Sequence, residues 1–223
     1  MTMKILAFDI SGFSCSIALG DIKSGQYDIT SHFHAEMAFG QAHMLLPEIQ
    51  RMLEEKNISV KDLDGIAVTR GPGSFTGIRA QLAAAKGLAL AHTLPVFGVD
   101  NFSVYAHKAR MSGEPLLVAL ETKRRDLYVQ LFSDPNTPIW GEGDSLEAES
   151  LAQKIMKENI QDIRVVGDGQ DHLSTVKGFS IDKNVCSIKA QDILSYVAHI
   201  GVQRFSKNLD LLKPLYLRPA LVQ

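Results

Sequence analysis

The sequence predicts an α/β protein with two duplicated lobes, each a mixed sheet flanked by helices, and three observations lead to this fold class. Short apolar runs of strand length alternate with longer segments that repeat with a helical period. A glycine-rich turn, GPGSFTGIR at residues 71–79, joins a buried strand to a helix. The segments KILAFDISGFSCSIALGD and PLLVALETKRRDLYVQLFSD share a layout of strand, acid, polar turn and second strand.

The first lobe is assigned to residues 1–112, which pass from a β-meander into alternating helices and strands. Residues 41–56 form a helix because their apolar side chains share one stripe, and Pro47 should kink this helix or mark its effective start. Residues 78–92 form a second, strongly apolar helix. The other expected elements are strands at 4–8, 15–20, 26–35, 65–69 and 95–99 and a helix at 102–110.

The second lobe is assigned to residues 113–223 and opens with the repeated layout. Its first strand ends at Glu121, and the polar turn TKRRD leads into the next strand. A later strand leaves through a GDG turn, and the chain ends in an extended tail broken by prolines. The expected elements are strands at 115–120, 127–132 and 163–167 and helices at 145–158 and 189–205.

Charge and cysteine content narrow the class of protein. The net charge is −2 and the pI is about 6.4, which disfavours a broad nucleic-acid surface on this chain alone. The densest basic cluster, Lys123, Arg124 and Arg125, is interpreted as a solvated turn. Cys15 and Cys186 form no disulfide framework. Neither a signal peptide nor an 18-residue apolar window occurs, so we expect a cytoplasmic protein without a membrane segment.

The glycine-rich turn is the strongest candidate for chemistry. Its glycines permit close backbone approach, and the following helix N-terminus offers free N–H groups to an anion. A purely structural turn that packs helix against strand explains the same residues, and the P-loop Gly-Lys-Ser/Thr is missing. Either Ser74 or Thr76 is expected to cap the helix. The candidate anion-binding residues of the turn are Gly71, Gly73, Ser74, Thr76 and Gly77.

Asp9 extends this candidate site, because it ends the first strand and precedes a Ser-Gly turn that begins at Ser11. A kinase-like fold would hold a metal–phosphate at such an acid, but a carboxylate there also caps its own turn. Asp9 and Ser11 therefore join the turn as a residual nucleotide or anion site. The histidines lack metal-ligand spacing and no G-x-S-x-G elbow occurs, so we expect neither a metal site nor covalent catalysis.

The helix after the glycine-rich turn carries a stripe of small residues, and its opposite side carries leucines, Leu82, Leu88 and Leu90. A helix that is apolar around most of its circumference is either buried within its lobe or lies at a subunit interface. Both interpretations remain open from the residues alone. The stripe consists of Ala80, Ala83, Ala84, Gly87 and Ala91.

Several segments together resemble the bacterial TsaB family, also called YeaZ, which takes part in making threonylcarbamoyladenosine in tRNA. The resemblance is carried by ILAFDISGFSCSIAL, GQAHMLLPEIQRML, DGIAVTRGPGSFTGIRAQLAAAKGLA, the GDG turn and PLYLR. It implies an actin/Hsp70/sugar-kinase-like fold with two duplicated lobes. The family's Asp-Ala-Arg-like run is replaced here by Glu121-Thr122-Lys123.

The same resemblance separates this chain from TsaD, the larger catalytic paralogue. Where TsaD-like proteins carry an H-x-x-x-H metal pair, this chain has Asn101 and Tyr105, which make poor ligands for iron or zinc. The glycine-rich C-terminal nucleotide segment of TsaD is also missing. The resemblance therefore implies a subunit that is not itself an enzyme.

The implied function is a non-catalytic subunit in the threonylcarbamoyl modification of tRNA adenosine 37. It would bind a TsaD-like catalytic subunit, help to recruit a TsaE-like ATPase, and meet tRNA only through the complex. Without TsaD it would form a homodimer through the same surface. No cofactor of its own is implied, and ATP would bind weakly or at a partner interface. The implied contact surface combines the stripe above with Leu45, Leu46, Ile49 and Leu53.

Two other functions remain as alternatives. An ATP-dependent small-molecule kinase of the same fold is suggested by Asp9 and the glycine-rich turn, but a second phosphate loop is missing. A metallopeptidase, a role once attached to TsaD-like proteins, is disfavoured by the absent histidine pair.

Overall fold

The computed structural model describes residues 2–110 and 113–217 and divides into two compact units. The first unit extends to Asp100 and takes up Lys189–Leu215, and the second contains Asn101–Ile188 and the described residues from Tyr216. This division differs from the predicted boundary at 112/113. The helix Asn101–Ala109, which follows the last strand of the first unit, belongs to the second unit, and the helix Ala190–Ile200, which follows the last strand of the second unit, belongs to the first. Local periodicity gives no signal of this exchange, since it depends on contacts far apart in the sequence.

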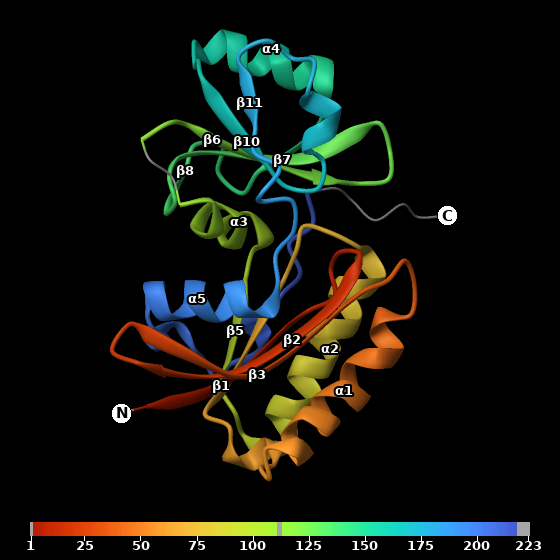
Figure 1. Cartoon of the computed structure of the whole chain (residues 1–223), viewed down its shortest axis with the longest axis vertical. Coiled ribbons are helices and arrows are strands. Elements are labelled where there is room, and N and C mark those ends of the chain that lie inside the picture. Colours follow the sequence, from red (N-terminus) through yellow and green to blue (C-terminus); the bar gives the residue numbers. More distant parts are fainter. Residues whose placement is uncertain (1, 111–112, 218–223) are drawn as a thin grey trace. The chain divides into compact units, whose positions relative to one another are not determined.

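The first unit contains a five-stranded sheet with the order β3-β2-β1-β4-β5 (Figure 1). The first three strands form an antiparallel meander, and β4 and β5 continue the sheet in parallel with β1. The strands are β1 (Met3–Asp9), β2 (Ser14–Lys23), β3 (Gln26–Glu36), β4 (Gly65–Thr69) and β5 (Val96–Val99).

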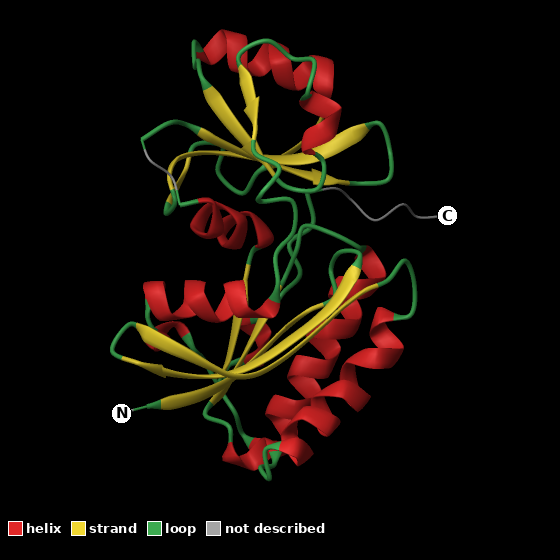
Figure 2. Cartoon of the chain, viewed as in Figure 1, coloured by secondary structure: helices red, strands yellow, loops and turns green. Residues whose placement is uncertain are grey.

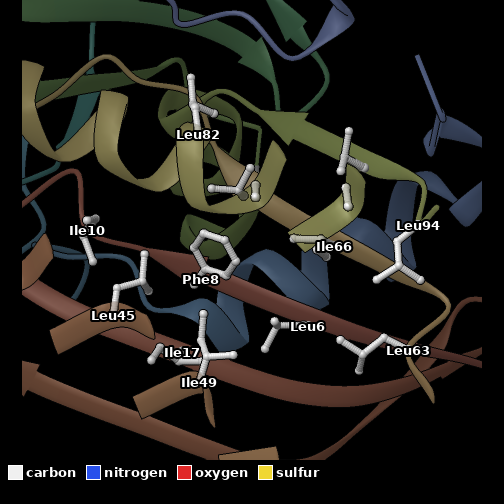
Figure 3. Packing of buried hydrophobic residues seen from close by; sticks show 14 of the residues in the cluster. Leu6, Phe8, Ile10, Ile17, Leu45, Ile49, Leu63, Ile66, Leu82 and Leu94 are labelled. Atoms are coloured by element: carbon white, nitrogen blue, oxygen red, sulfur yellow. The ribbon is translucent and has the colours of Figure 1, made fainter. Parts of the chain in front are cut away.

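Helices cover both faces of this sheet (Figure 1). On one face lie α1 (Gln41–Glu55) and α2 (Phe75–His92), and on the other lies α5 (Ala190–Ile200), which contacts β1, β2 and β3. Figure 3 shows side chains from β1, β2, β4, α1 and α2 gathered around Phe8, which is fully buried. Helix α1 already begins at Gln41, so Pro47 lies inside it and does not mark its start.

The second unit contains a sheet, whose strands are drawn in yellow in the upper part of Figure 2. Its strand order is β11-β10-β6-β7-β8, and β9 also pairs with β7. Helix α3 (Asn101–Ala109) contacts β6 and β7, and α4 (Ala148–Glu158) follows β9. The strands are β6 (Leu116–Glu121), β7 (Asp126–Asp134), β8 (Thr137–Pro138), β9 (Asp144–Glu147), β10 (Ile163–Val166) and β11 (Phe179–Ile181).

The two sheets repeat one topology, which confirms the predicted duplication. Strand β6 pairs antiparallel with β7 and parallel with β10, as β1 pairs antiparallel with β2 and parallel with β4. Strands β9 and β11 take the places of β3 and β5 at the edges. The α/β fold class with two mixed sheets and flanking helices is therefore confirmed.

Two predicted helices end differently in the structure. The expected helix over 145–158 begins only at Ala148, because Asp144–Glu147 pair with β7 as a strand. The expected helix over 189–205 ends at Ile200, where Gly201 adopts φ 93°, and a short 3₁₀ turn follows. Within residues 2–110 and 113–217, no helix combines the length and apolar character needed to cross a membrane.

Candidate functional site

The glycine-rich turn links the end of β4 to α2, and Ser74 is the residue that caps the helix. The Ser74 hydroxyl oxygen accepts a hydrogen bond from the Gly77 amide at 3.3 Å, and its carbonyl accepts from the Ile78 amide at 2.8 Å. Capping by Ser74 starts α2 at Phe75, three residues before the predicted start. Thr76 is exposed in the first helical turn and is not the cap.

Two glycines of the turn pack against the chain that leaves β1. The Ser74 amide donates to the Ser11 carbonyl at 2.7 Å, which fixes the turn against this segment. A Cβ atom on Gly73 would lie 2.6 Å from the same carbonyl oxygen, and one on Gly77 would collide with the carbonyl oxygen of Ile10. The absence of a Cβ at these two glycines thus lets the turn pack closely against the chain that leaves β1.

Gly71 opens the turn in a left-handed conformation, with φ 106°, which favours glycine. The neighbouring residue Arg70 accepts a hydrogen bond at its carbonyl from the Leu215 amide, at 2.7 Å. A Cβ atom on Gly71 would lie 2.9 Å from the Leu215 carbonyl oxygen. The C-terminal segment of the first unit therefore packs closely beside the turn.

Asp9 lies at the carboxyl end of β1, and its side chain is only 3% exposed. One carboxylate oxygen, Oδ1, accepts hydrogen bonds from the Ser11 hydroxyl at 2.6 Å, from the Ser11 amide at 3.2 Å and from the Thr69 hydroxyl. Burial raises the pKa of the Asp9 carboxyl above its usual value, and the hydrogen bonds from Ser11 and Thr69 offset part of this effect.

A residue that the sequence did not single out, Gln81, completes this buried polar cluster. Its amide nitrogen donates to the carbonyl and hydroxyl oxygens of Thr69, at 2.6 and 2.7 Å. Its amide oxygen accepts from the Ile10 amide at 2.6 Å. Gln81 thereby ties α2 to the ends of both β1 and β4. A lone glutamine between Ala80 and Leu82 in an apolar helix was the available signal.

The arrangement of Asp9, Ser11, Thr69 and Gln81 is a closed hydrogen-bonded network at the base of the turn. Such a network fixes the positions of two strand ends and one helix relative to one another. In the part of the chain that the structure describes, no group of three or more His, Cys, Asp or Glu residues is arranged to hold a metal ion.

The predicted contact surface divides into core and exposed residues. Leu45, Ile49 and Leu53 are at most 4% exposed because α1 packs them against the sheet, so these three predicted interface residues lie in the core of the first unit. Leu46 is 49% exposed on the outer side of α1. The apolar period of α1 predicted one stripe, and the structure shows that this stripe faces the core.

Helix α2 presents a different surface, because part of its small-residue stripe faces solvent. Ala80 and Ala84 are half-buried against the core, whereas Ala83, Gly87 and Ala91 are exposed. Leu90, which was expected on the opposite side, lies among the exposed residues and is 76% exposed. We call this exposed apolar strip the α2 ridge; it consists of Ala83, Gly87, Leu90 and Ala91.

The positions compared with a metal pair lie on α3, inside the second unit. Asn101 is 4% exposed and Tyr105 is 5% exposed. The Tyr105 hydroxyl donates to the Cys186 carbonyl at 3.4 Å. Both side chains are therefore part of the packing of this unit.

Comparison with known proteins places these features in a family. The family described as tRNA N6-adenosine threonylcarbamoyltransferase, TsaD, matches residues 40–137. The tRNA threonylcarbamoyladenosine biosynthesis protein TsaB of Escherichia coli K12 is 30% identical, over 97% of this chain and 95% of that protein. The TsaB protein of Buchnera aphidicola subsp. Schizaphis graminum is 30% identical, over 88% of this chain and 94% of that protein.

Solved structures give the same fold. A Pseudomonas aeruginosa structure, described as an uncharacterized protein with similarity to peptidase YEAZ, superposes with a TM-score of 0.76 at 23% identity. The match covers 97% of this chain and 100% of that chain.

Proposed function

This chain belongs to the TsaB family of tRNA threonylcarbamoyladenosine biosynthesis proteins, and from that membership we propose that it serves the threonylcarbamoyl modification of tRNA adenosine 37. Its part in this process is that of a non-catalytic subunit. It binds a TsaD-like catalytic subunit, helps to recruit a TsaE-like ATPase, and meets tRNA through that complex. Its place of action is the cytoplasm.

The observation that carries this proposal is the α2 ridge. Leu90 exposes 76% of its surface beside exposed small residues, and a Cβ on Gly87 would meet no atom within 4 Å other than those of its chain neighbours and of the backbone of its own helix. Small residues next to an exposed leucine allow a second helix to approach closely and cover the leucine. The partner helix belongs to the TsaD-like subunit, or to a second copy of this chain when TsaD is absent.

The buried network supports the non-catalytic part of the proposal. Asp9 Oδ1 accepts hydrogen bonds from Ser11 and Thr69, and Gly73 and Gly77 pack against the backbone of Ser11 and Ile10. These residues stabilise the start of α2. No cofactor is required by this chain, and ATP binds weakly or at the partner interface.

Co-purification of the full chain with the TsaD-like protein of the same genome tests the proposal. We expect a stable complex for the natural sequence and at least a tenfold weaker one for Gly87→Glu, because an unpaired carboxylate would be buried between the helices. The matched control is Gln153→Glu on α4, which adds the same charge at an exposed position. An intact complex with Gly87→Glu, in a variant that remains folded by circular dichroism, contradicts this surface.

The kinase alternative is favoured by one observation, the position of Asp9 near the N-terminus of α2. Calorimetry of the isolated chain with Mg-ATP separates the two functions, because a kinase binds ATP tightly and with unit stoichiometry. The metallopeptidase alternative requires stoichiometric iron or zinc in the purified protein, which elemental analysis measures.

A further inference from the structure

The β6–β7 turn of the second unit carries the densest basic cluster of the sequence, Lys123, Arg124 and Arg125, and all three side chains are exposed. We propose that this turn binds phosphates of the tRNA backbone while the tRNA is held in the modification complex. The inference rests on the proposed function, and it assigns to this chain a direct contact with the RNA.

The acids that flank the cluster are turned away from it. Asp126 is 5% exposed, and its carboxylate accepts hydrogen bonds from the hydroxyl of Thr122, at 3.2 Å, and from that of Ser145. Glu121 accepts from the Lys123 amide at 2.7 Å and pairs with His172 at 2.7 Å. Both carboxylates therefore accept hydrogen bonds from groups within the turn or beside it, and the side chains of Arg124 and Arg125 are exposed.

The backbone of the turn is held in one conformation. The Thr122 hydroxyl donates to the Asp126 carbonyl at 2.6 Å and accepts from the Arg124 amide at 3.2 Å. Lys123 adopts φ 59° between them. A turn fixed in this way presents its side chains without a backbone ordering cost on binding.

The two arginines differ from the structural arginine of the same unit. Arg164 is held by Asp182 at 2.6 Å and by Glu114 at 3.0 Å. Within residues 2–110 and 113–217, neither Arg124 nor Arg125 forms an ion pair. This includes Glu147, an acid on β9 that pairs with Asp126, the residue next to Arg125. Their guanidinium groups are therefore available to an external anion.

Phosphate is the anion that this arrangement suits best. A guanidinium presents a planar fork of donors that matches phosphate oxygens, and neighbouring cations favour a ligand with repeated charges. The chain as a whole carries a net charge of −2, so the positive potential is local to the turn. A local basic turn adds contacts to an RNA already bound by a partner, and this agrees with tRNA binding through the complex.

Salt-dependent binding tests the inference. An unmodified tRNA transcript with adenosine at position 37 is titrated, over a series of salt concentrations, with the full chain alone and with its complex with the TsaD-like protein. The variant R124Q/R125Q should reduce the slope of log K against log salt by about 1.5, since each lost phosphate contact removes about 0.7 to 0.9. R124K/R125K should keep most of the slope because it keeps the charge.

The matched control is K157Q/K177Q, which removes two exposed charges near the opposite end of the second sheet and should leave the slope unchanged. Equal slopes for R124Q/R125Q and the natural sequence, or equal reductions in both double variants, overturn the inference. Displacement of the tRNA by ATP or inorganic phosphate at matched phosphate concentration also overturns it, because the turn would then bind small phosphates.

The same variants also show whether the turn contacts a protein instead of RNA. Loss of the complex in R124Q/R125Q would mean that the turn binds an acidic protein surface, and this too overturns the inference. If the natural chain forms no complex, the proposed function fails, and the titration of the chain alone still decides whether the turn contacts RNA.

Discussion

The parallel strand pairs β1–β4 and β6–β10 occupy equivalent places in the two sheets, but the residues at their carboxyl ends differ in burial and charge. In the first unit, Asp9 is buried in a closed network and the glycine-rich turn starts an 18-residue helix. In the second, Glu121 pairs with the half-exposed His172, and the GDG turn leads to a 3₁₀ segment of four residues. One end is closed and supports a long helix, and the other exposes its charged side chains.

The comparison also shows a feature that the two units share, which is a close backbone contact at a glycine. Gly73 packs against the Ser11 carbonyl oxygen, and Gly167, with φ 108°, packs against that of Ala119. Both glycines let the chain leaving one parallel strand pass close to the end of its neighbour. This backbone fit is common to the two units, whereas the surrounding side chains form a buried hydrogen-bonded network in one and expose charge in the other.

The largest expected effect comes from filling the backbone contact in the first unit. Gly77→Ala places a Cβ atom against the Ile10 carbonyl oxygen and should lower the free energy of unfolding by about 3 kcal/mol. Gly87→Ala is the matched control on the same helix, with open space around the new atom. It should raise stability by about 0.5–1 kcal/mol. Urea denaturation measures both, and similar changes in the two variants would show that the contact does not matter.

A smaller effect, visible as a pH dependence, should come from Asp9. Its folded-state pKa is raised by burial, so its contribution to stability is complete below the unfolded-chain pKa of about 3.9. That contribution is lost as pH rises through the raised folded value. Asp9→Asn removes this loss, and its stability relative to the natural chain should therefore improve as pH rises across that window. Urea denaturation at several pH values tests this, and a difference that stays constant with pH contradicts it.

The smallest effect belongs to the open end of the second unit. Glu121→Gln removes the carboxylate that contacts His172, whose side chain is 53% exposed. Solvent screens such a pair, so the free energy of unfolding should fall by less than about 1 kcal/mol, and by less still at high salt. Thermal unfolding measures the change. A loss as large as that of Gly77→Ala would mean that the two strand ends are equally important for stability.

Local patterns predicted much of the fold. Apolar periodicity and turn chemistry, which depend on neighbouring residues, predicted the strand that ends at Asp9, the helix after the glycine-rich turn and a cap at Ser74 or Thr76. The structure shows that Ser74 is the cap. Strand β9 was missed because Asp144–Glu147 is short and polar, and it is fixed by pairing with β7. The exchange of α3 and α5 was missed for the same physical reason.

The candidate site was predicted in part. Asp9, Ser11 and the glycines do lie together, because the carboxyl ends of parallel strands meet at one edge of a sheet. Periodicity placed Leu45 and Leu90 on stripes, but whether a stripe faces sheet or solvent depends on which elements cover it. Leu45 is 2% exposed and Leu90 is 76% exposed. Gln81 was missed because its partners, Ile10 and Thr69, are distant in sequence.

The exchange of α3 and α5 also sets the order in which the chain can fold during synthesis. Most of the second unit, Asn101–Ile188, lies between the two segments of the first in the sequence. One face of the first sheet needs Leu194 and its neighbours on α5, and the Ala190 amide donates to the buried Ser16 hydroxyl at 2.8 Å. The ribosome must therefore release the C-terminal segment before this face of the N-terminal sheet is covered, so the first unit is completed only after most of the second has been translated.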